Sequence, residues 1–217
     1  MTDFSKLFDL TRSRSGNFLL KCACLSDLFS NLHPFLCQLG ATLDSIEFME
    51  ISPKVWAHKR AEISSSACIL PPCIIDEGTQ IRPNAYLRGG VLLGKNCVVG
   101  NATELKNSIL FDEAKAPHFN YVGESILGCR AHLGAGVILS NVRLDGQKIR
   151  LDGVDTGLKK LGSLLGDNVE IGCNSVLNPG TVVGKNAFIY PMSCVKGIVP
   201  GDRVFKDGKI TKRGYQV

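Results

Sequence analysis

The side chains best suited to acid–base chemistry in this 217-residue chain centre on one histidine, His118. It lies in residues 115–123, which read KAPHFNYVG and also supply Tyr121. An imidazole titrates near neutral pH, so a well-placed histidine can take a proton from a reacting group. A single histidine is more often a solvated or core side chain, so its role depends on what surrounds it.

Positive charge is placed upstream of this histidine with regular spacing. Arg88 and Lys106 are separated by three consecutive six-residue repeats, and Glu104 lies just before Lys106. In a solenoid whose coil consists of three such repeats, Arg88 and Lys106 lie on the same face in successive coils. This spacing is compatible with a solvated surface, and beside a histidine it also predicts an anion pocket.

The six-residue repeat predicts the elements that hold these side chains. Aliphatic or aromatic residues recur every six positions from Ile63 to Phe111, from Leu127 to Leu139, and again from Leu165 to Val195. A period of six fits neither a helix nor simple strand alternation. It predicts an all-β fold, a single-stranded left-handed parallel β-helix in which three hexads form one coil. About six coils at a spacing of roughly 4.8 Å give a prism on the order of 29 Å tall.

The chain divides into three predicted regions. Residues 1–48 lack the hexad and are expected to form a helical N-terminal cap, with Pro34 splitting its main helical stretch into two short helices. The β-helix is predicted over 49–203. A C-terminal tail follows at 204–217, with a hairpin-like turn at residues 207–208.

Two interruptions of the repeat are predicted to be loop insertions that carry function. In the first, residues 115–122, the hexad count places Pro117 and His118 where an inward aliphatic residue is due. The second, residues 142–164, is rich in glycine and basic residues. It is either a solvated basic loop or a flexible arm that brings cations to a phosphate. Its cations are Arg143, Lys148, Arg150, Lys159 and Lys160.

Composition limits the function classes. The net charge of +5 is dispersed, without a Lys/Arg tract, so a nucleic-acid partner is not expected. No apolar run reaches the roughly 18–20 residues of a membrane span, and the N-terminus lacks signal-peptide features, so we expect a cytoplasmic protein. Nine cysteines, an odd number, predict reduced thiols, with Cys73 and Cys97 as small core residues and no metal site.

Several segments carry a family resemblance: NATELKNSIL at 101–110, KAPHFNYVGE at 115–124, LGAG at 133–136 and TGLKKLG at 156–162. Together they resemble the acetyltransferase domain of the bifunctional glucosamine-1-phosphate acetyltransferase / N-acetylglucosamine-1-phosphate uridylyltransferase, including its archaeal sugar-1-phosphate versions. The resemblance covers about residues 50–200. The preceding residues are too few for a nucleotidyltransferase domain, so we do not expect uridylyltransferase activity.

The resemblance implies an acetyl-CoA-dependent N-acetyltransferase acting on an amino-sugar phosphate such as glucosamine-1-phosphate, assembled as a homotrimer and needing no metal for transfer. His118 matches the general base that deprotonates the sugar amine. The predicted substrate-binding residues are Arg88, Glu104, Lys106, Tyr121, His132, Asn141, Lys148 and Arg150. The predicted CoA-binding residues are Cys173, Pro191 and Lys206. His132 stands where the family usually has asparagine, and Cys173 replaces a serine.

Three alternatives remain on the sequence alone. A related prism could transfer longer acyl chains from acyl carrier protein to a sugar. A γ-type carbonic anhydrase needs three zinc-binding histidines, but the chain has four histidines without the required close pair. A non-catalytic β-helix that assembles other proteins is the third.

Overall fold

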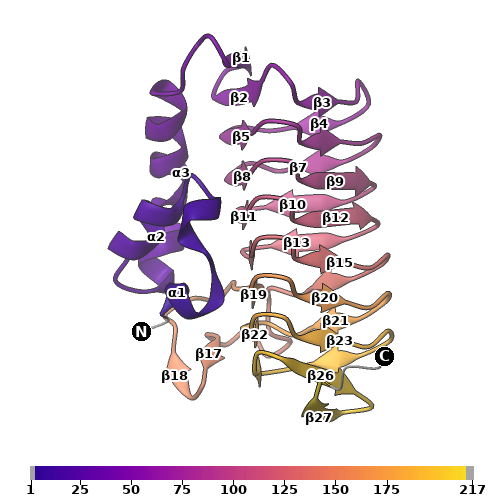
Figure 1. Cartoon of the computed structure of the whole chain (residues 1–217). Helices are drawn as coiled ribbons and strands as arrows, with labels where there is room; N and C mark the ends of the chain where they lie inside the picture. The colour runs from indigo at the N-terminus through magenta and orange to yellow at the C-terminus, as the bar shows by residue number, and fades with distance from the viewer. Residues whose placement is uncertain (1–2, 214–217) are drawn as a thin grey trace.

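Three sheets stack into the three faces of a triangular prism, and helices lie along one of its sides (Figure 1). This computed structural model describes residues 3–213. Within the prism, successive strands of each face lie one coil apart in the chain and pair in parallel, as Leu105 does with Leu87 and with Val122. The predicted fold, a left-handed parallel β-helix with a small helical segment, is confirmed.

The elements have the following bounds. The helices are α1 (Phe4–Leu7), η1 (Leu10–Arg12), α2 (Gly16–Lys21) and α3 (Leu25–Ala41). Face A consists of β1 (Phe48–Ser52), β2 (Val55–His58), β5 (Cys73–Ile75), β8 (Val91–Leu93), β11 (Ser108–Leu110), β14 (Ile126–Leu127), β19 (Ser163–Leu165), β22 (Thr181–Val183) and β25 (Ile198–Val199). Face B consists of β3 (Glu62–Ile63), β6 (Gln80–Ile81), β9 (Val98–Asn101), β12 (Lys115–His118), β15 (His132–Leu133), β20 (Glu170–Ile171), β23 (Phe188–Ile189), β26 (Arg203–Lys206) and β27 (Lys209–Lys212). Face C consists of β4 (Cys68–Ile69), β7 (Tyr86–Leu87), β10 (Glu104–Lys106), β13 (Tyr121–Gly123), β16 (Ile138–Leu139), β21 (Val176–Leu177) and β24 (Cys194–Val195).

The prism is taller than the hexad count predicted. Eight strands of face A, from β2 to β25, stack in parallel, so there are eight coils and not six. At about 4.8 Å per step, the first and last coils are about 34 Å apart. The count passed over inward residues at both ends and in one middle coil, which are Ala57, Ala116, Val122, Val199 and Phe205. The inward aliphatic residues form one continuous core along the prism axis.

The first phase change comes earlier than predicted. Leu110 points into the prism and pairs with Leu93, in the position that the hexad count assigned to Phe111. Phe111 instead packs outside the prism and stacks on Phe8 at 5.1 Å. The coil is shortened by one residue at the corner between faces C and A, and Asn107 occupies that corner with a left-handed φ of 46°.

The predicted loop insertion at residues 115–122 is wrong. Strands β12 and β13 occupy this segment, and Ala116 fills the inward position in register with Val99. The hexad count passed over Ala116 because a small inward residue does not stand out in a search for large aliphatic ones. His118 therefore lies at a regular corner of the solenoid, in register with Asn101.

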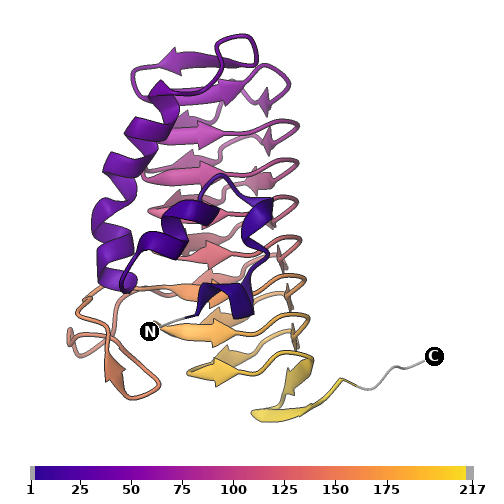
Figure 2. The same cartoon turned by 60° about the vertical axis from the view of Figure 1, so that its left-hand side comes forward.

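Face A is the face that the helices cover (Figure 2). The middle residue of each inner strand points outward there, yet it is apolar and buried against the helices. These residues are Ile74, Leu92, Ile109, Ile126, Leu164 and Val182. Helix α3 contributes Leu28, Leu32 and Leu36, all fully buried. This second core fixes the helical segment to the prism.

Helix α3 runs unbroken through Pro34, so the predicted split into two helices is wrong. Proline removes one backbone donor from a helix and leaves the carbonyl four residues earlier without its partner. Pro34 and Ser30 both lie on the exposed side of α3, where water can satisfy that carbonyl. The leucines on the opposite side hold the helix against face A.

The second interruption is present as an arm, residues 140–162. Leu127 pairs with Leu165 across the whole of this insertion, whereas the other coils of face A are close to three hexads long. The arm forms a small hairpin of β17 (Arg150–Leu151) and β18 (Val154–Asp155). Its Ile149 and Leu161 are buried in the core shared with the helices. The arm is therefore anchored, in contrast to the predicted solvated or flexible loop.

An antiparallel strand caps one face at each end of the solenoid. At the first coil β1 pairs with β2, and at the last β27 pairs with β26 through a turn at Asp207 and Gly208. The predicted hairpin-like turn is confirmed, although β26 still pairs with β23 and so belongs to the prism. Residues 214–217 of the predicted tail lie outside the described residues. No helix among residues 3–213 is long and apolar enough to cross a bilayer.

All nine cysteines are free thiols, and Cys73 and Cys97 are fully buried in the prism core, as predicted.

Near the start of α3, two neighbouring thiols have pKa values shifted in opposite directions. Burial raises the pKa of the Cys22 thiol to about 11. The Ser26 hydroxyl, 3.0 Å from the Cys24 sulfur, together with the Asp27 backbone, lowers the pKa of exposed Cys24.

We expect iodoacetamide at neutral pH to alkylate Cys24 faster than Cys22, by tenfold or more. The thiolate is the nucleophile, and both pKa shifts favour thiolate at Cys24. Peptide mass spectrometry over a time course measures the two rates, and Ser26→Ala should slow only Cys24. Equal labelling of both thiols in the folded protein would contradict the placement of Cys22.

Candidate functional site

His118 belongs to a column of corner residues between faces B and C, one from each coil. The members are identified by hydrogen bonds between coils, in which the residue after one member donates its N–H to the carbonyl of the member in the preceding coil. These bonds are Phe119 N to Asn101 O (2.9 Å), Gly136 N to His118 O (3.0 Å), Asn174 N to Ala135 O (2.8 Å) and Met192 N to Cys173 O (2.9 Å). Pro191 is next in register below Cys173. At about 4.8 Å per coil, Cys173 is about 10 Å and Pro191 about 14 Å from His118 along this edge.

The His118 ring is exposed, while its backbone is firmly held. Its N–H donates to Asn120 Oδ1 at 3.1 Å, and the buried Asn120 donates in turn to the Gly134 carbonyl at 2.8 Å. Among residues 3–213 the imidazole itself makes no hydrogen bond. A ring on a rigid corner with both nitrogens accessible can meet a substrate from outside the prism.

Around the corner, face C gathers the predicted substrate-binding residues into two ion pairs and one amide–phenol contact. Arg88 lies 2.7 Å from Glu104 across adjacent strands. Lys106 Nζ lies 3.4 Å from a carboxylate oxygen of Glu124. Asn141 donates from Nδ2 to the Tyr121 hydroxyl at 3.0 Å.

Glu124 is the residue of this cluster that sequence reasoning missed. Its side chain is buried, accepts hydrogen bonds from Asn107 Nδ2 at 3.0 Å and from Asn141, and pairs with Lys106. It joins Lys106 to Asn141 and, through Asn141, to Tyr121. The sequence spacing carried no signal for it, because the burial of Glu124 depends on the conformation of its corner.

The backbone leaves room for these contacts at Gly123. A Cβ there would lie 2.7 Å from both Asn141 Nδ2 and the Tyr121 hydroxyl.

Partial burial and the neighbouring Glu124 carboxylate raise the pKa of Tyr121, so its hydroxyl stays protonated at neutral pH and can donate to a ligand.

Charge on face C is balanced within the chain. The guanidinium of Arg88 faces Glu104, and the ammonium of Lys106 faces Glu124. Arg88 and Glu104 are both partly exposed, and pairs of this kind rearrange at little cost. Lys106 and Glu124 are more enclosed and stay together. An anion on this face therefore meets Arg88 first, with Lys106 as a fixed second cation.

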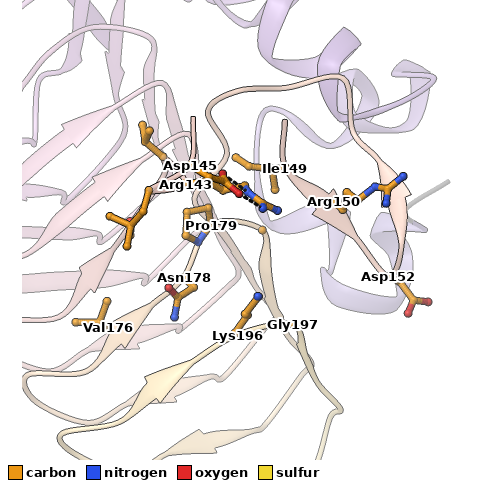
Figure 3. Close-up of a pocket in the computed structure, with 14 residues that line it drawn as sticks. Arg143, Asp145, Ile149, Arg150, Asp152, Val176, Asn178, Pro179, Lys196 and Gly197 are labelled. Atoms are coloured by element: carbon orange, nitrogen blue, oxygen red, sulfur yellow. Dashed lines mark hydrogen bonds and ion pairs between the residues drawn. The ribbon is translucent and has the colours of Figure 1, made fainter. Parts of the chain in front are cut away.

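Below this cluster the arm covers a pocket of about 500 Å³ (Figure 3). Ser140 and Val142, on either side of Asn141, line it, so the pocket begins where the cluster ends. Its charged lining residues are Arg143, Asp145, Arg150, Asp152 and Lys196. Arg143 is held by Asp145, whereas Arg150 approaches from the β17–β18 hairpin.

Two predicted substrate-binding residues lie apart from both the cluster and the pocket. His132 is on face B, where its Nδ1 is 2.8 Å from Glu170 in the next coil, so it is not next to Tyr121 or Asn141 within one protomer. Lys148 is exposed on the arm and does not line the pocket, in contrast to Arg150. The position of Lys148 was out of reach of a hexad count, because the count does not determine which way an inserted arm folds, whereas His132 lies at a regular position of β15.

The predicted CoA-binding residues follow the same edge as His118. Cys173 and Pro191 are exposed members of the corner column. Lys206 is one position away, and its ammonium lies 4.7 Å from the centre of the Tyr190 ring. Among residues 3–213 there is no group of three or more His, Cys, Asp or Glu side chains that could hold a metal ion.

Two family matches cover most of the prism. Residues 69–154 match the GMPPB C-terminal domain, and residues 162–197 match the bacterial transferase hexapeptide (six repeats). The first match ends within the arm, and the second begins where the arm returns to the prism.

Similar proteins extend the comparison. The chain is 33% identical over 176 residues to the bifunctional sugar-1-phosphate nucleotidylyltransferase/acetyltransferase of Sulfurisphaera tokodaii, covering 79% of this chain and 43% of that protein. It is 38% identical over 110 residues to the bifunctional protein GlmU of Methanococcus maripaludis, covering 49% of this chain and 27% of that protein. A solved acetyltransferase domain of PglB from Neisseria gonorrhoeae is 15% identical, with a TM-score of 0.36, covering 67% of this chain and 53% of that one.

The chain therefore contains a hexapeptide-repeat region and resembles part of these bifunctional proteins. It spans less than half the length of either relative.

Proposed function

We propose that the protein is an acetyl-CoA-dependent N-acetyltransferase whose acceptor is an amino-sugar phosphate such as glucosamine-1-phosphate. One observation carries the proposal. The exposed imidazole of His118 lies on the same prism edge as Cys173 and Pro191, and around the corner from the cations of face C. A donor lying along the edge and an acceptor on face C would meet at His118.

In this proposal His118 acts as the general base. Its neutral imidazole takes a proton from the sugar 2-amine as the amine nitrogen bonds to the thioester carbonyl carbon. The tetrahedral intermediate then collapses, the carbon–sulfur bond breaks, and the imidazolium returns the proton to the departing CoA thiolate. The products are the N-acetylated sugar phosphate and CoA, with the histidine restored to its neutral form.

The acceptor phosphate is proposed to bind Arg88 and Lys106. Arg88 can exchange its exposed partner Glu104 for a phosphate, with which it forms a bidentate pair. Tyr121 and Asn141 offer a hydroxyl and an amide to the sugar ring. Arg150, at the pocket beneath the arm, is proposed as the arm cation, in preference to Lys148.

The proposed donor site needs a second wall, because a single prism edge is convex. We therefore propose a homotrimer in which another copy faces this edge. Face A takes no part in that contact, because the helices cover it. Nine free thiols fit a reducing compartment, and we propose that the protein acts in the cytoplasm.

We expect Arg88→Met to raise the acceptor KM for glucosamine-1-phosphate by tenfold or more, because a charge-assisted pair with the phosphate is lost. The kcat and the acetyl-CoA KM should change little. Steady-state assays of CoA release measure this, with Arg82→Met on face B as the matched control. Glucosamine without phosphate should show no difference between the wild-type protein and Arg88→Met. An equal rise in KM for both acceptors would remove Arg88 from the phosphate site.

A further inference from the structure

Helix α3 reaches the candidate site through one side chain. His33 Nε2 lies 2.7 Å from Asn107 Oδ1, at the corner between faces C and A. An amide oxygen can only accept, so His33 Nε2 carries the hydrogen in this contact. The contact joins the helical segment to the corner that precedes the cluster on face C.

Two contacts together hold the side-chain amide of Asn107. With Oδ1 turned toward His33, the amide nitrogen Nδ2 faces Glu124 and donates to Oε1 at 3.0 Å. The opposite orientation would turn the amide oxygen toward a carboxylate, which can only accept, so Glu124 fixes which end of the amide faces it. His33 holds the other end by donating to Oδ1, and so completes the anchoring of Asn107.

Glu124 passes this orientation on to the cluster. Its Oε1 receives Asn107 and faces Lys106 Nζ at 3.4 Å, which leaves Oε2 for Asn141. Asn141 then holds the Tyr121 hydroxyl. A continuous polar chain thus runs from His33 to three of the side chains proposed to bind the acceptor.

The backbone is shaped around the start of this chain. Gly90 has a φ of +65°, and a Cβ there would lie 2.3 Å from Asn107 Oδ1 and 2.5 Å from His33 Nε2. Glu124 itself has a left-handed φ of 42°, an unfavourable conformation for a glutamate. Other corners of the solenoid place non-glycine residues in the same region, Glu113 and Phe119 among them, so the turn sets this conformation and directs the Glu124 side chain to its partners.

His33 adds little to the attachment of the helix. Its ring is exposed, whereas Leu28, Leu32 and Leu36 of the same helix are fully buried. A side chain that is dispensable for packing and yet joins a buried polar chain is placed for positioning. We propose that His33 is a positioning residue that orients Lys106, Asn141 and Tyr121 for the acceptor through Asn107 and Glu124. This inference rests on the proposed function.

The test compares His33→Leu, which cannot donate, with His33→Gln, whose amide can. We expect His33→Leu to raise the acceptor KM about threefold to tenfold, with kcat and the acetyl-CoA KM unchanged. His33→Gln should recover most of the wild-type acceptor KM. Gln38→Leu, on an exposed position of α3 without a side-chain hydrogen bond in the described residues, is the matched control. Thermal unfolding should be similar in all variants.

A second measurement does not depend on turnover. With selective 15N-asparagine labelling, the side-chain amide signals of Asn107 and Asn141 should shift in His33→Leu and stay in place in Gln38→Leu. If the wild-type protein transfers no acetyl group, the proposed function fails while these shifts still report the polar chain. Unshifted amides, or a His33→Gln variant as impaired as His33→Leu, would overturn the positioning role.

Discussion

His118→Asn is expected to reduce acetyl transfer at least about a hundredfold, since general bases typically contribute 10² to 10⁴ in rate. The asparagine amide cannot accept the amine proton at neutral pH. The corner should remain intact, because the backbone N–H of this residue, and not its ring, makes the contact with Asn120. Loss of kcat with a nearly unchanged acceptor KM, measured by CoA release, would identify a base and not a binding group.

The matched control for this variant is His58→Asn. The His58 ring is buried in the first coil, and its Nδ1 accepts from the backbone N–H of Arg60 at 3.0 Å. An asparagine oxygen can take over that role, so turnover should stay close to wild type. Turnover of His118→Asn within a factor of three of the wild-type rate would falsify the base assignment.

Leu92→Asp is expected to destabilise the protein by about 4 kcal/mol or more, which is among the largest effects of single substitutions. Leu92 points out of face A and is 1% exposed beneath the helices. An aspartate there loses the buried apolar area and places an unpaired carboxylate in the second core. A fall in Tm of about 10 °C, or proteolytic release of the helical segment before unfolding of the prism, would show it.

The comparison for this variant is Ile46→Asp. Ile46 is also aliphatic, but it is 77% exposed in the turn after α3, so the charge remains in water. Its unfolding temperature should stay within about 2 °C of wild type, as is usual for surface substitutions. If Leu92→Asp were as stable as Ile46→Asp, the helices would not be packed on face A in solution.

The fold could be predicted from sequence because the inward residues of a solenoid repeat along the chain. Leu87, Leu105 and their counterparts alternate with turns at a period that no other architecture shares. The same periodicity gave a wrong assignment at Phe111. The coil is one residue shorter before this position, so Leu110 points inward, and Phe111 only coincides with the sixth position of the count. A count of large apolar residues shows where such residues recur along the chain. It does not show where a corner is one residue shorter.

The candidate site was predictable in part for the same reason. Four predicted residues occupy regular coil positions. Their spacing in the sequence therefore places His118 on one edge, and Arg88, Lys106 and Tyr121 on face C. Glu124 and His33 were not predicted, because their roles depend on a corner conformation and on the way a separate helix packs. Contacts between the helical segment and the solenoid do not repeat along the chain, so no sequence period reveals them.

The two antiparallel end strands have a consequence for association. A stack of parallel strands ends in unpaired backbone groups, and each such edge can template further coils from another molecule. β1 and β27 each present a strand that runs against the direction of the stack. An incoming parallel strand therefore finds no matching ladder on face A at the first coil or on face B at the last. The other edges, β3, β4, β24 and β25, remain parallel, so each short end strand removes one of the three edges through which coils of another molecule could add.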